Sequence, residues 1–193
     1  AYLQVTKKCG AEVRLVPDDG AGQLDVEALE GMMDGRVKLI ALTHVPTNGG
    51  LVNPAAAVGH IARSHGIPFL LDACQSVGQL PVNVDDLGCD MLSATGRKYL
   101  RGPRGSGFLY VRESMIEQLE PPMLDLHAAT WTDEGDFSIR TDARRFENWE
   151  CNVAAKIGLG VAADYAQALD PAVTGPRIQC LAAHLRDCLS IVP

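Results

Sequence analysis

The feature of this sequence that most constrains its fold is an alternation of short apolar runs with segments of helical periodicity. Residues 37–43 form an almost continuous apolar run, and residues 68–72 and 89–94 form two more. Such continuity is typical of strands buried on both faces of a sheet. Helical patterns occupy residues 25–33, which begin with acidic residues, and residues 54–66, which end in glycine. A parallel sheet with crossover helices has this order of elements, so the sequence predicts an α/β fold.

The remaining segments continue this organisation. Residues 12–17 have a strand-like pattern, and residues 107–111 resemble a return strand that follows a glycine-rich stretch. Residues 120–145 contain two adjacent prolines and many polar residues, so we expect an ordered excursion or a partly mobile loop there. Two helices are expected after it, at 151–168 and 177–190, with a break between them that contains a proline and a glycine.

Composition limits the classes of partner. The 193 residues, 47% apolar and 21% charged, suit one compact unit with a sizeable core. A net charge of −7 argues against a nucleic-acid or anionic-membrane partner. No apolar run approaches the roughly 18 residues of a membrane span, and the N-terminus lacks the layout of a signal peptide, so we expect a cytoplasmic protein. The six cysteines have neither CxxC nor Cys/His spacing, so neither a metal site nor a disulfide framework is expected.

Three candidate polar groups follow expected strands. In a parallel sheet the carboxyl ends of the strands lie at one edge, where ligands bind. His44, Asp72 and Lys98 each lie at or just after such an end. Each has a structural alternative: a strand-ending aspartate is often a turn former, a lone histidine is often structural, and most lysines are solvated. Lys98 differs from other lysines because the glycine-rich stretch 102–107 follows it and leaves room for a ligand. That stretch matches no phosphate-loop pattern, since a strand follows it.

Three segments together carry a family resemblance. They are THVPTNGG at 43–50, LDACQSVG at 71–78 and TGRKYLRGPRGSGFLY at 95–110. Their order and spacing are similar to those of the class V aminotransferase family, which includes cysteine desulfurases, lyases and epimerases that use pyridoxal 5'-phosphate (PLP). The resemblance implies an aspartate aminotransferase-like large domain, a three-layer sandwich with a mostly parallel sheet, in truncated form. It implies a PLP-binding portion over residues 1–165 and a helical segment over 166–193 that leads toward a further, C-terminal domain.

The resemblance also implies a role for each residue around the coenzyme ring. Lys98 would form the Schiff base and later move protons, and Asp72 would pair with the pyridine nitrogen so that the ring withdraws electrons. His44 would stack on the ring. Gln75 would approach the phenolate oxygen, and Cys74 takes the small position under the ring.

Other positions match the family or depart from it. Thr95 corresponds to a phosphate-binding serine, and Arg97 replaces a histidine. An arginine can still hold phosphate but cannot act as an acid or base near neutral pH. Thr47 takes the place of an asparagine that contacts the coenzyme oxygen or the substrate. Residues 149–150, Trp-Glu, stand where the family has the Gly-Thr pair that reaches the phosphate of a neighbouring subunit. A carboxylate near a phosphate repels it, so these departures favour a lyase, epimerase or aminotransferase-like branch over a desulfurase.

Two functions follow as alternatives. The first is a PLP-dependent enzyme that acts on an amino acid by lyase or transferase chemistry, and the resemblance implies that it works as a homodimer. The second is a catalytically incomplete, truncated module that keeps the sheet and serves as an interaction domain or has no independent function. The two differ in whether the chain binds PLP and turns over an amino acid.

Overall fold

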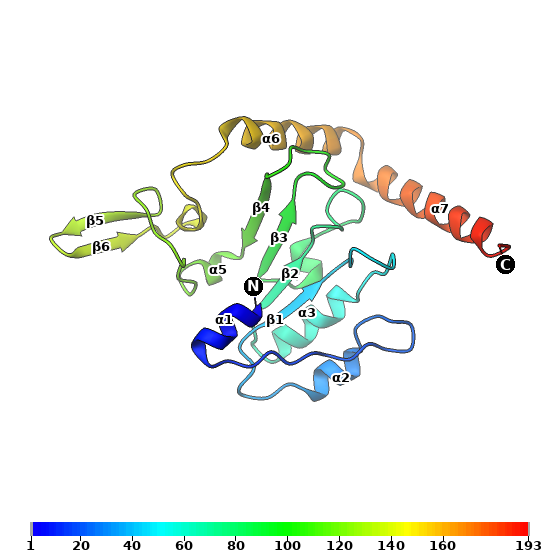
Figure 1. Ribbon diagram of the computed structural model, residues 1–193, viewed down its shortest axis with the longest axis horizontal. Coiled ribbons are helices and arrows are strands. Elements are labelled where there is room, and N and C mark those ends of the chain that lie inside the picture. The colour runs from blue at the N-terminus through cyan, green and yellow to red at the C-terminus, as the bar shows by residue number, and fades with distance from the viewer. Residues whose placement is uncertain (1, 193) are drawn as a thin grey trace.

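The computed structural model describes residues 2–192 and has α/β architecture. Its main sheet has four strands in the order β1-β2-β3-β4, shown in Figure 1. The strands β1 (Ile40–Thr43), β2 (Phe69–Asp72) and β3 (Met91–Thr95) are parallel, and β4 (Gly107–Val111) returns antiparallel to β3. The fold class expected from the alternation of elements is confirmed.

Three helices accompany the parallel strands. Between β1 and β3 lie α3 (Ala55–Ser64) and the short α4 (Val84–Leu87), while α2 (Val26–Gly31) precedes β1. Asp25 caps α2 by accepting a hydrogen bond from the Ala28 amide, which satisfies one of the free N–H groups at a helix start. These helices supply the inward-facing side chains that cover one face of the sheet.

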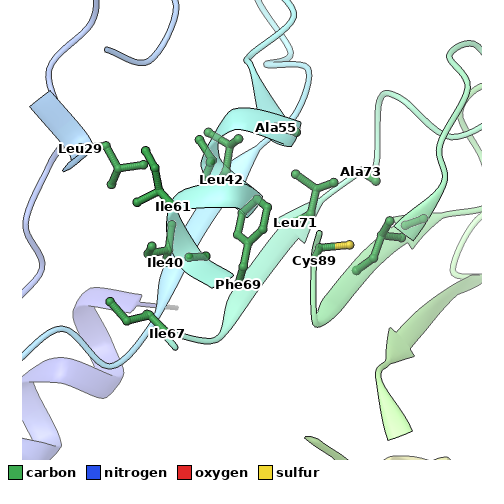
Figure 2. Packing of buried hydrophobic residues seen from close by; sticks show 14 residues of the cluster. Leu29, Ile40, Leu42, Ala55, Ile61, Ile67, Phe69, Leu71, Ala73 and Cys89 are labelled. Carbon is green, nitrogen blue, oxygen red and sulfur yellow. The ribbon is translucent and has the colours of Figure 1, made fainter. Parts of the chain in front are cut away.

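The core lies between this helical layer and the sheet (Figure 2). Phe69 and Leu71 of β2 are fully buried, as is Val58 of α3. Leu42 of β1 and Leu92 of β3 flank them in the same cluster. Burial of these apolar side chains is the main stabilising contribution to the fold.

Two expectations for strands are corrected. Residues 37–43 were expected to be buried on both faces, but burial alternates along β1 and leaves Ala41 and Thr43 exposed. The helix α1 (Tyr2–Cys9), which precedes these elements, has no buried residue. Residues 12–17 are not a strand, although their pattern suits one. A strand needs a hydrogen-bonding neighbour, and this segment pairs with no described strand of the sheet.

The excursion at 120–145 is ordered. After α5 (Glu113–Ile116) it contains a hairpin of β5 (Ala129–Asp133) and β6 (Asp136–Ile139), followed by the 3-10 helix η1 (Ala143–Phe146). The hairpin reverses at Gly135, whose φ of 85° is readily adopted only by glycine. Figure 1 shows the hairpin projecting from one end of the molecule.

Two long helices close the chain. They are α6 (Val153–Ala168) and α7 (Pro171–Leu189), and α7 extends away from the sheet in Figure 1. A break separates the two helices as expected, but it covers only residues 169–170, and α7 begins at Pro171, six residues before the expected 177. Proline is tolerated at the first helical position because its missing N–H would be unpaired there anyway, and the Asp170 carboxylate caps this start. The expected boundary at residue 165 falls inside α6, and the division of the chain stays a prediction.

No helix in the described part of the chain is both long and apolar enough to cross a membrane.

We predict that Phe69→Ala will lower the free energy of unfolding by about 3–5 kcal/mol, because the fully buried ring leaves a cavity in the core. Phe108→Ala is the matched control, since Phe108 on β4 is 42% exposed and should cost clearly less. Urea unfolding of both variants measures the difference. Equal losses would contradict this description of the core.

Candidate functional site

Asp72 and Lys98 lie on neighbouring parts of the carboxyl edge of the sheet. Asp72 ends β2 and is in register with Ser93 of β3. Lys98 follows β3 after a short turn, and both side chains are half-buried. Because β2 and β3 are adjacent and parallel, the carboxylate and the amine are brought to the same edge.

Cys74 shares this position with them. Its backbone N–H donates to the Asp72 carboxylate at 3.0 Å. Burial raises the pKa of the Cys74 thiol, and a hydrogen bond from the thiol to Asp72 raises that pKa further, while the charge of Lys98 and the Thr95 backbone lower it. Asp72 therefore caps a local turn through the Cys74 amide and also lies at the edge of the sheet from which Lys98 follows. A role as turn former and a role in binding a ligand are compatible for this residue.

Backbone hydrogen bonds close the loop that carries Lys98. The Gly96 amide donates to the Ser106 carbonyl at 2.9 Å, and the Gly102 amide donates to the Gly96 carbonyl at 2.7 Å. Inside the loop, the Arg101 amide donates to the Lys98 carbonyl at 2.9 Å. These bonds hold the lysine in a compact, defined loop.

Gly78 allows a second loop to lie directly against the lysine loop. A Cβ at Gly78 would be 2.7 Å from the Tyr99 carbonyl carbon and 2.9 Å from the Leu100 nitrogen. Its φ of 91° also disfavours other residues. The segment after Asp72 is thus fixed against the segment after Lys98 by backbone contact. A glycine six residues after a strand-ending aspartate was a signal of this approach in the sequence, but its role was not recognised.

His44 is buried, with 6% of its surface exposed. Its backbone N–H donates to the Asp72 carbonyl at 3.0 Å, and its Nδ1 has no partner among the described residues. Burial lowers the pKa of the imidazole, which is therefore the neutral form near neutral pH. A ring with so little exposed surface favours a structural role for His44. Stacking of this ring on a coenzyme stays a prediction.

The remaining candidates differ in placement. Gln75 and Thr95 are half-buried beside the groups already described, and the Thr95 hydroxyl donates to the Ser106 carbonyl at 3.5 Å. Thr47 and Arg97 are exposed, and their side chains form no hydrogen bond with any residue from 2 to 192. The structure therefore brings Asp72, Cys74 and Lys98 together and leaves Thr47 and Arg97 free.

Tyr2 is a neighbour of Asp72 that the sequence did not indicate. Burial is the main cause that raises the pKa of the Tyr2 hydroxyl, and the negative charge of Asp72 raises that pKa further. This residue precedes the first expected strand and belongs to no motif, so only the folded structure places it here.

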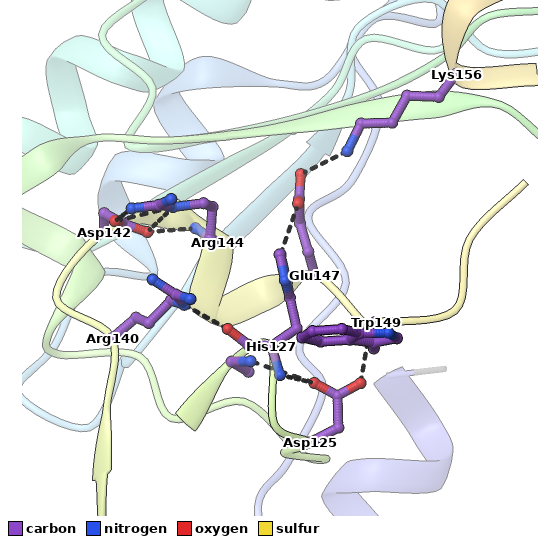
Figure 3. A network of polar contacts seen from close by, with 9 residues as sticks. Asp125, His127, Arg140, Asp142, Arg144, Glu147, Trp149 and Lys156 are labelled. Carbon is purple, nitrogen blue, oxygen red and sulfur yellow. Dashed lines mark hydrogen bonds and ion pairs between the residues drawn. The ribbon is translucent and has the colours of Figure 1, made fainter. Parts of the chain in front are cut away.

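A polar network fixes the segment with the unusual Trp-Glu pair (Figure 3). The Asp125 carboxylate accepts hydrogen bonds from the amides of Trp149 at 2.7 Å and His127 at 2.8 Å. Glu147 pairs with His127 at 3.3 Å and with Lys156 at 3.4 Å. The Trp149 backbone is thereby anchored while its side chain remains 65% exposed.

Two hollows lie outside this group of residues. One, of about 570 Å³, is at the amino edge of the sheet and includes Lys38 and His65 in its lining. The other, of about 580 Å³, lies between the lysine loop and α6, with Arg101 and Tyr165 in its lining. Asp72 lines neither hollow. The candidate site is therefore identified by the kinds of side chain that meet at the edge of the sheet, and not by the size of a cavity.

A mostly parallel sheet with a carboxylate and a lysine at its carboxyl edge has the arrangement in which α/β domains commonly bind small molecules. The family model for aminotransferase class V matches residues 1–193. The chain belongs to the class V aminotransferase family, which uses PLP.

Individual relatives agree with this placement. A cysteine desulfurase of Escherichia coli is 35% identical over 177 residues, which are 87% of this chain and 41% of the relative. The apo structure of a cysteine desulfurase from Thermococcus onnurineus NA1 has a TM-score of 0.89 at 28% identity, covering 98% of this chain and 47% of that one. A structure of C-DES with glycine covalently linked to the PLP cofactor has the same TM-score at 22% identity, which shows the fold, and covers all of this chain and 52% of that one. The chain spans about two fifths of the length of the curated relatives it matches.

We predict that Gly78→Ala will destabilise the protein more than Gly22→Ala. Both glycines have a similar positive φ, 91° and 84°, so each substitution costs roughly 1–2 kcal/mol of backbone strain. Only at Gly78 would the new methyl group collide with backbone, because nothing lies within 4 Å of a Cβ at Gly22. Urea midpoints of the two variants test this, and equal midpoints would show that the two loops are not in contact.

We predict that His44 will make stability fall with decreasing pH. Burial lowers the pKa of folded His44 below its ordinary 6.5. The unfolded chain therefore binds a proton below about pH 6.5 that the folded protein does not bind. Stability from this group is complete above that pH and is lost as pH falls toward the folded pKa, with a slope of at most about 1.4 kcal/mol per pH unit.

The measurement is the free energy of unfolding at several pH values for the parent and for His44→Gln, which cannot ionise. The slope should be shallower in this variant. The exposed His60, substituted by Gln, controls for the loss of one histidine. An unchanged slope in His44→Gln would refute the assignment.

Proposed function

We propose that this chain is the coenzyme-binding part of a PLP-dependent enzyme that acts on an amino acid. The single observation that carries the proposal is the convergence of Asp72, Cys74 and Lys98 at one edge of the sheet, where the Cys74 amide donates to the Asp72 carboxylate at 3.0 Å and Lys98 follows the adjacent strand. Those groups come from the ends of two adjacent parallel strands, at the edge where α/β sheets bind ligands.

The residues present suit the coenzyme. When bound, PLP supplies an electron sink that stabilises negative charge on the substrate α-carbon. Lys98 would hold it covalently and would move the proton at that carbon. Asp72 would keep the pyridine nitrogen protonated, because a carboxylate favours a nearby positive charge. Gln75 would lie beside the phenolate oxygen, and the neutral Cys74 thiol would take little space under the ring.

Phosphate binding is the less complete part of the proposal. Thr95 is near the group, and Arg97 offers a permanent positive charge that suits a phosphate. Thr47 would contact the coenzyme oxygen or the substrate. We assign His44 a supporting role, because its buried ring is neutral and its backbone N–H donates a hydrogen bond to the Asp72 carbonyl.

The substrate proposed is cysteine or a related sulfur amino acid, acted on by carbon–sulfur lyase or sulfur-transfer chemistry. This rests on the names of the relatives, among which cysteine desulfurases recur. The Arg97 and Glu150 departures favour lyase chemistry within that range. The proposed location is the cytoplasm.

A homodimer is the proposed assembly. On α6 the side chains of Val153, Ile157, Val161 and Tyr165 recur at every fourth position and are each more than half exposed. Apolar stripes of this kind favour burial against another surface. The exposed Trp149 lies just before this helix, on the segment that would face the partner.

We predict that PLP followed by borohydride will label Lys98 in preference to the other lysines, because Lys98 follows β3 at the carboxyl edge of the sheet where Asp72 ends β2. Peptide mapping by mass spectrometry locates the label. Lys98→Arg should abolish the major labelled peptide, while Lys38→Arg, on an exposed position at the opposite edge, should leave it unchanged.

Two outcomes would contradict the proposal. A label spread evenly over exposed lysines would show that no coenzyme site exists. A specific label on Lys98, with no turnover of cysteine by the purified chain, would favour the catalytically incomplete module.

A further inference from the structure

The turn after Lys98 contains a backbone conformation that its side chain disfavours. Arg101 has a φ of 60°, and Asp170 is the only other non-glycine residue from 2 to 192 with a positive φ. Left-handed backbone is unfavourable for a residue with a Cβ, and glycine follows immediately at position 102. An arginine at this point therefore needs a compensating interaction.

That interaction comes from α6. The guanidinium carbon of Arg101 lies 4.9 Å from the centroid of the Tyr165 ring, which is within the range of a favourable cation–π contact. The contact spans the hollow between the lysine loop and α6. Its strength is of the same order as the backbone strain, so it can offset the strain.

Other contacts show that α6 supports the whole loop. A Cβ on Gly158 of α6 would lie 2.7 Å from the Pro103 ring, and a Cβ on Gly96 would lie 2.7 Å from Leu159. The helix thus lies against both ends of the lysine loop. Arg101 is the point at which a charged side chain of the loop reaches across to it.

We propose that Arg101 and Tyr165 are positioning residues that hold Lys98 in the orientation required for reaction with the coenzyme. The inference rests on the proposed function, because it concerns the reactivity of the same lysine. The Arg101 amide closes the turn by donating to the Lys98 carbonyl, and the Tyr165 ring holds the Arg101 side chain against α6. Neither side chain touches the reacting atoms.

The test compares stability with lysine reactivity in four variants of the full chain. Arg101→Gly removes the guanidinium and also the strain, Arg101→Lys keeps a cation, Tyr165→Leu removes the ring, and Tyr165→Phe keeps it. We expect Arg101→Gly to unfold at an equal or higher urea concentration than the parent, yet to label at Lys98 roughly 5–10-fold more slowly with PLP and borohydride. Tyr165→Leu should slow labelling similarly, and Tyr165→Phe and Arg101→Lys should stay within about twofold of the parent.

The split between the two readouts distinguishes positioning from stabilisation. A purely structural Arg101 would affect labelling only through unfolding, so Arg101→Gly would label like the parent. That result, or slow labelling in Tyr165→Phe, would overturn the inference. The double variant Arg101→Gly with Tyr165→Leu should be no slower than either single variant, because both remove one contact.

A second readout is independent of the coenzyme. Amide hydrogen exchange of residues 96–102 should be faster in Tyr165→Leu and unchanged in Tyr165→Phe, because the bonds at Arg101 and Gly102 close the loop. If the parent fails to label Lys98, the proposed function fails and the exchange result alone decides the inference. Unchanged exchange in Tyr165→Leu would overturn it.

Discussion

The arrangement of the site depends on the parallel pairing of β2 with β3. In this ladder Leu71 is opposite Leu92 and Asp72 is opposite Ser93. The side chains of a strand alternate between its faces, so a shift by one residue would bury Asp72 and expose Leu71. The apolar core therefore sets the register, and the register decides which side of the sheet carries the carboxylate. Stability and chemistry are specified by the same pairing.

Backbone contacts of the loop after β3 then fix the position of Lys98 relative to the sheet. The amine is on a long, flexible side chain, so its position depends on where the loop holds its Cα. Gly78 lets one loop lie on the backbone of Tyr99, and Gly96 lets another segment lie under Ser106. Larger side chains would separate these segments. The glycines at positions 78 and 96 are therefore explained by the close approach of neighbouring segments that a side chain would prevent, and not by flexibility.

The sequence predicted the strands and helices whose pattern is decided locally or by burial. The apolar runs at β1, β2 and β3, and the proline and glycine at the two ends of α3, have clear signals of this kind. It failed where the outcome depends on distant partners. Residues 12–17 have strand composition but pair with no described strand of the sheet. The hairpin of β5 and β6 was missed for another reason, since its strands, in register at Trp131 and Phe137, lie within an otherwise polar segment. The strand-end rule located Asp72 and Lys98, while Tyr2 and Tyr165 could be found only from the folded chain.

The Trp-Glu pair that departs from the family pattern lies on a rigid base. Asp125 accepts from three backbone amides, including that of Trp149, and these bonds lower the pKa of its carboxyl. An ionised Asp125 keeps all three bonds near neutral pH, so the backbone at 149 is held in one place. The exposed side chains of Trp149 and Glu150 can therefore vary without loosening the segment. A fixed backbone with exposed side chains allows the residues at this position to differ from the family pattern while the segment keeps its conformation.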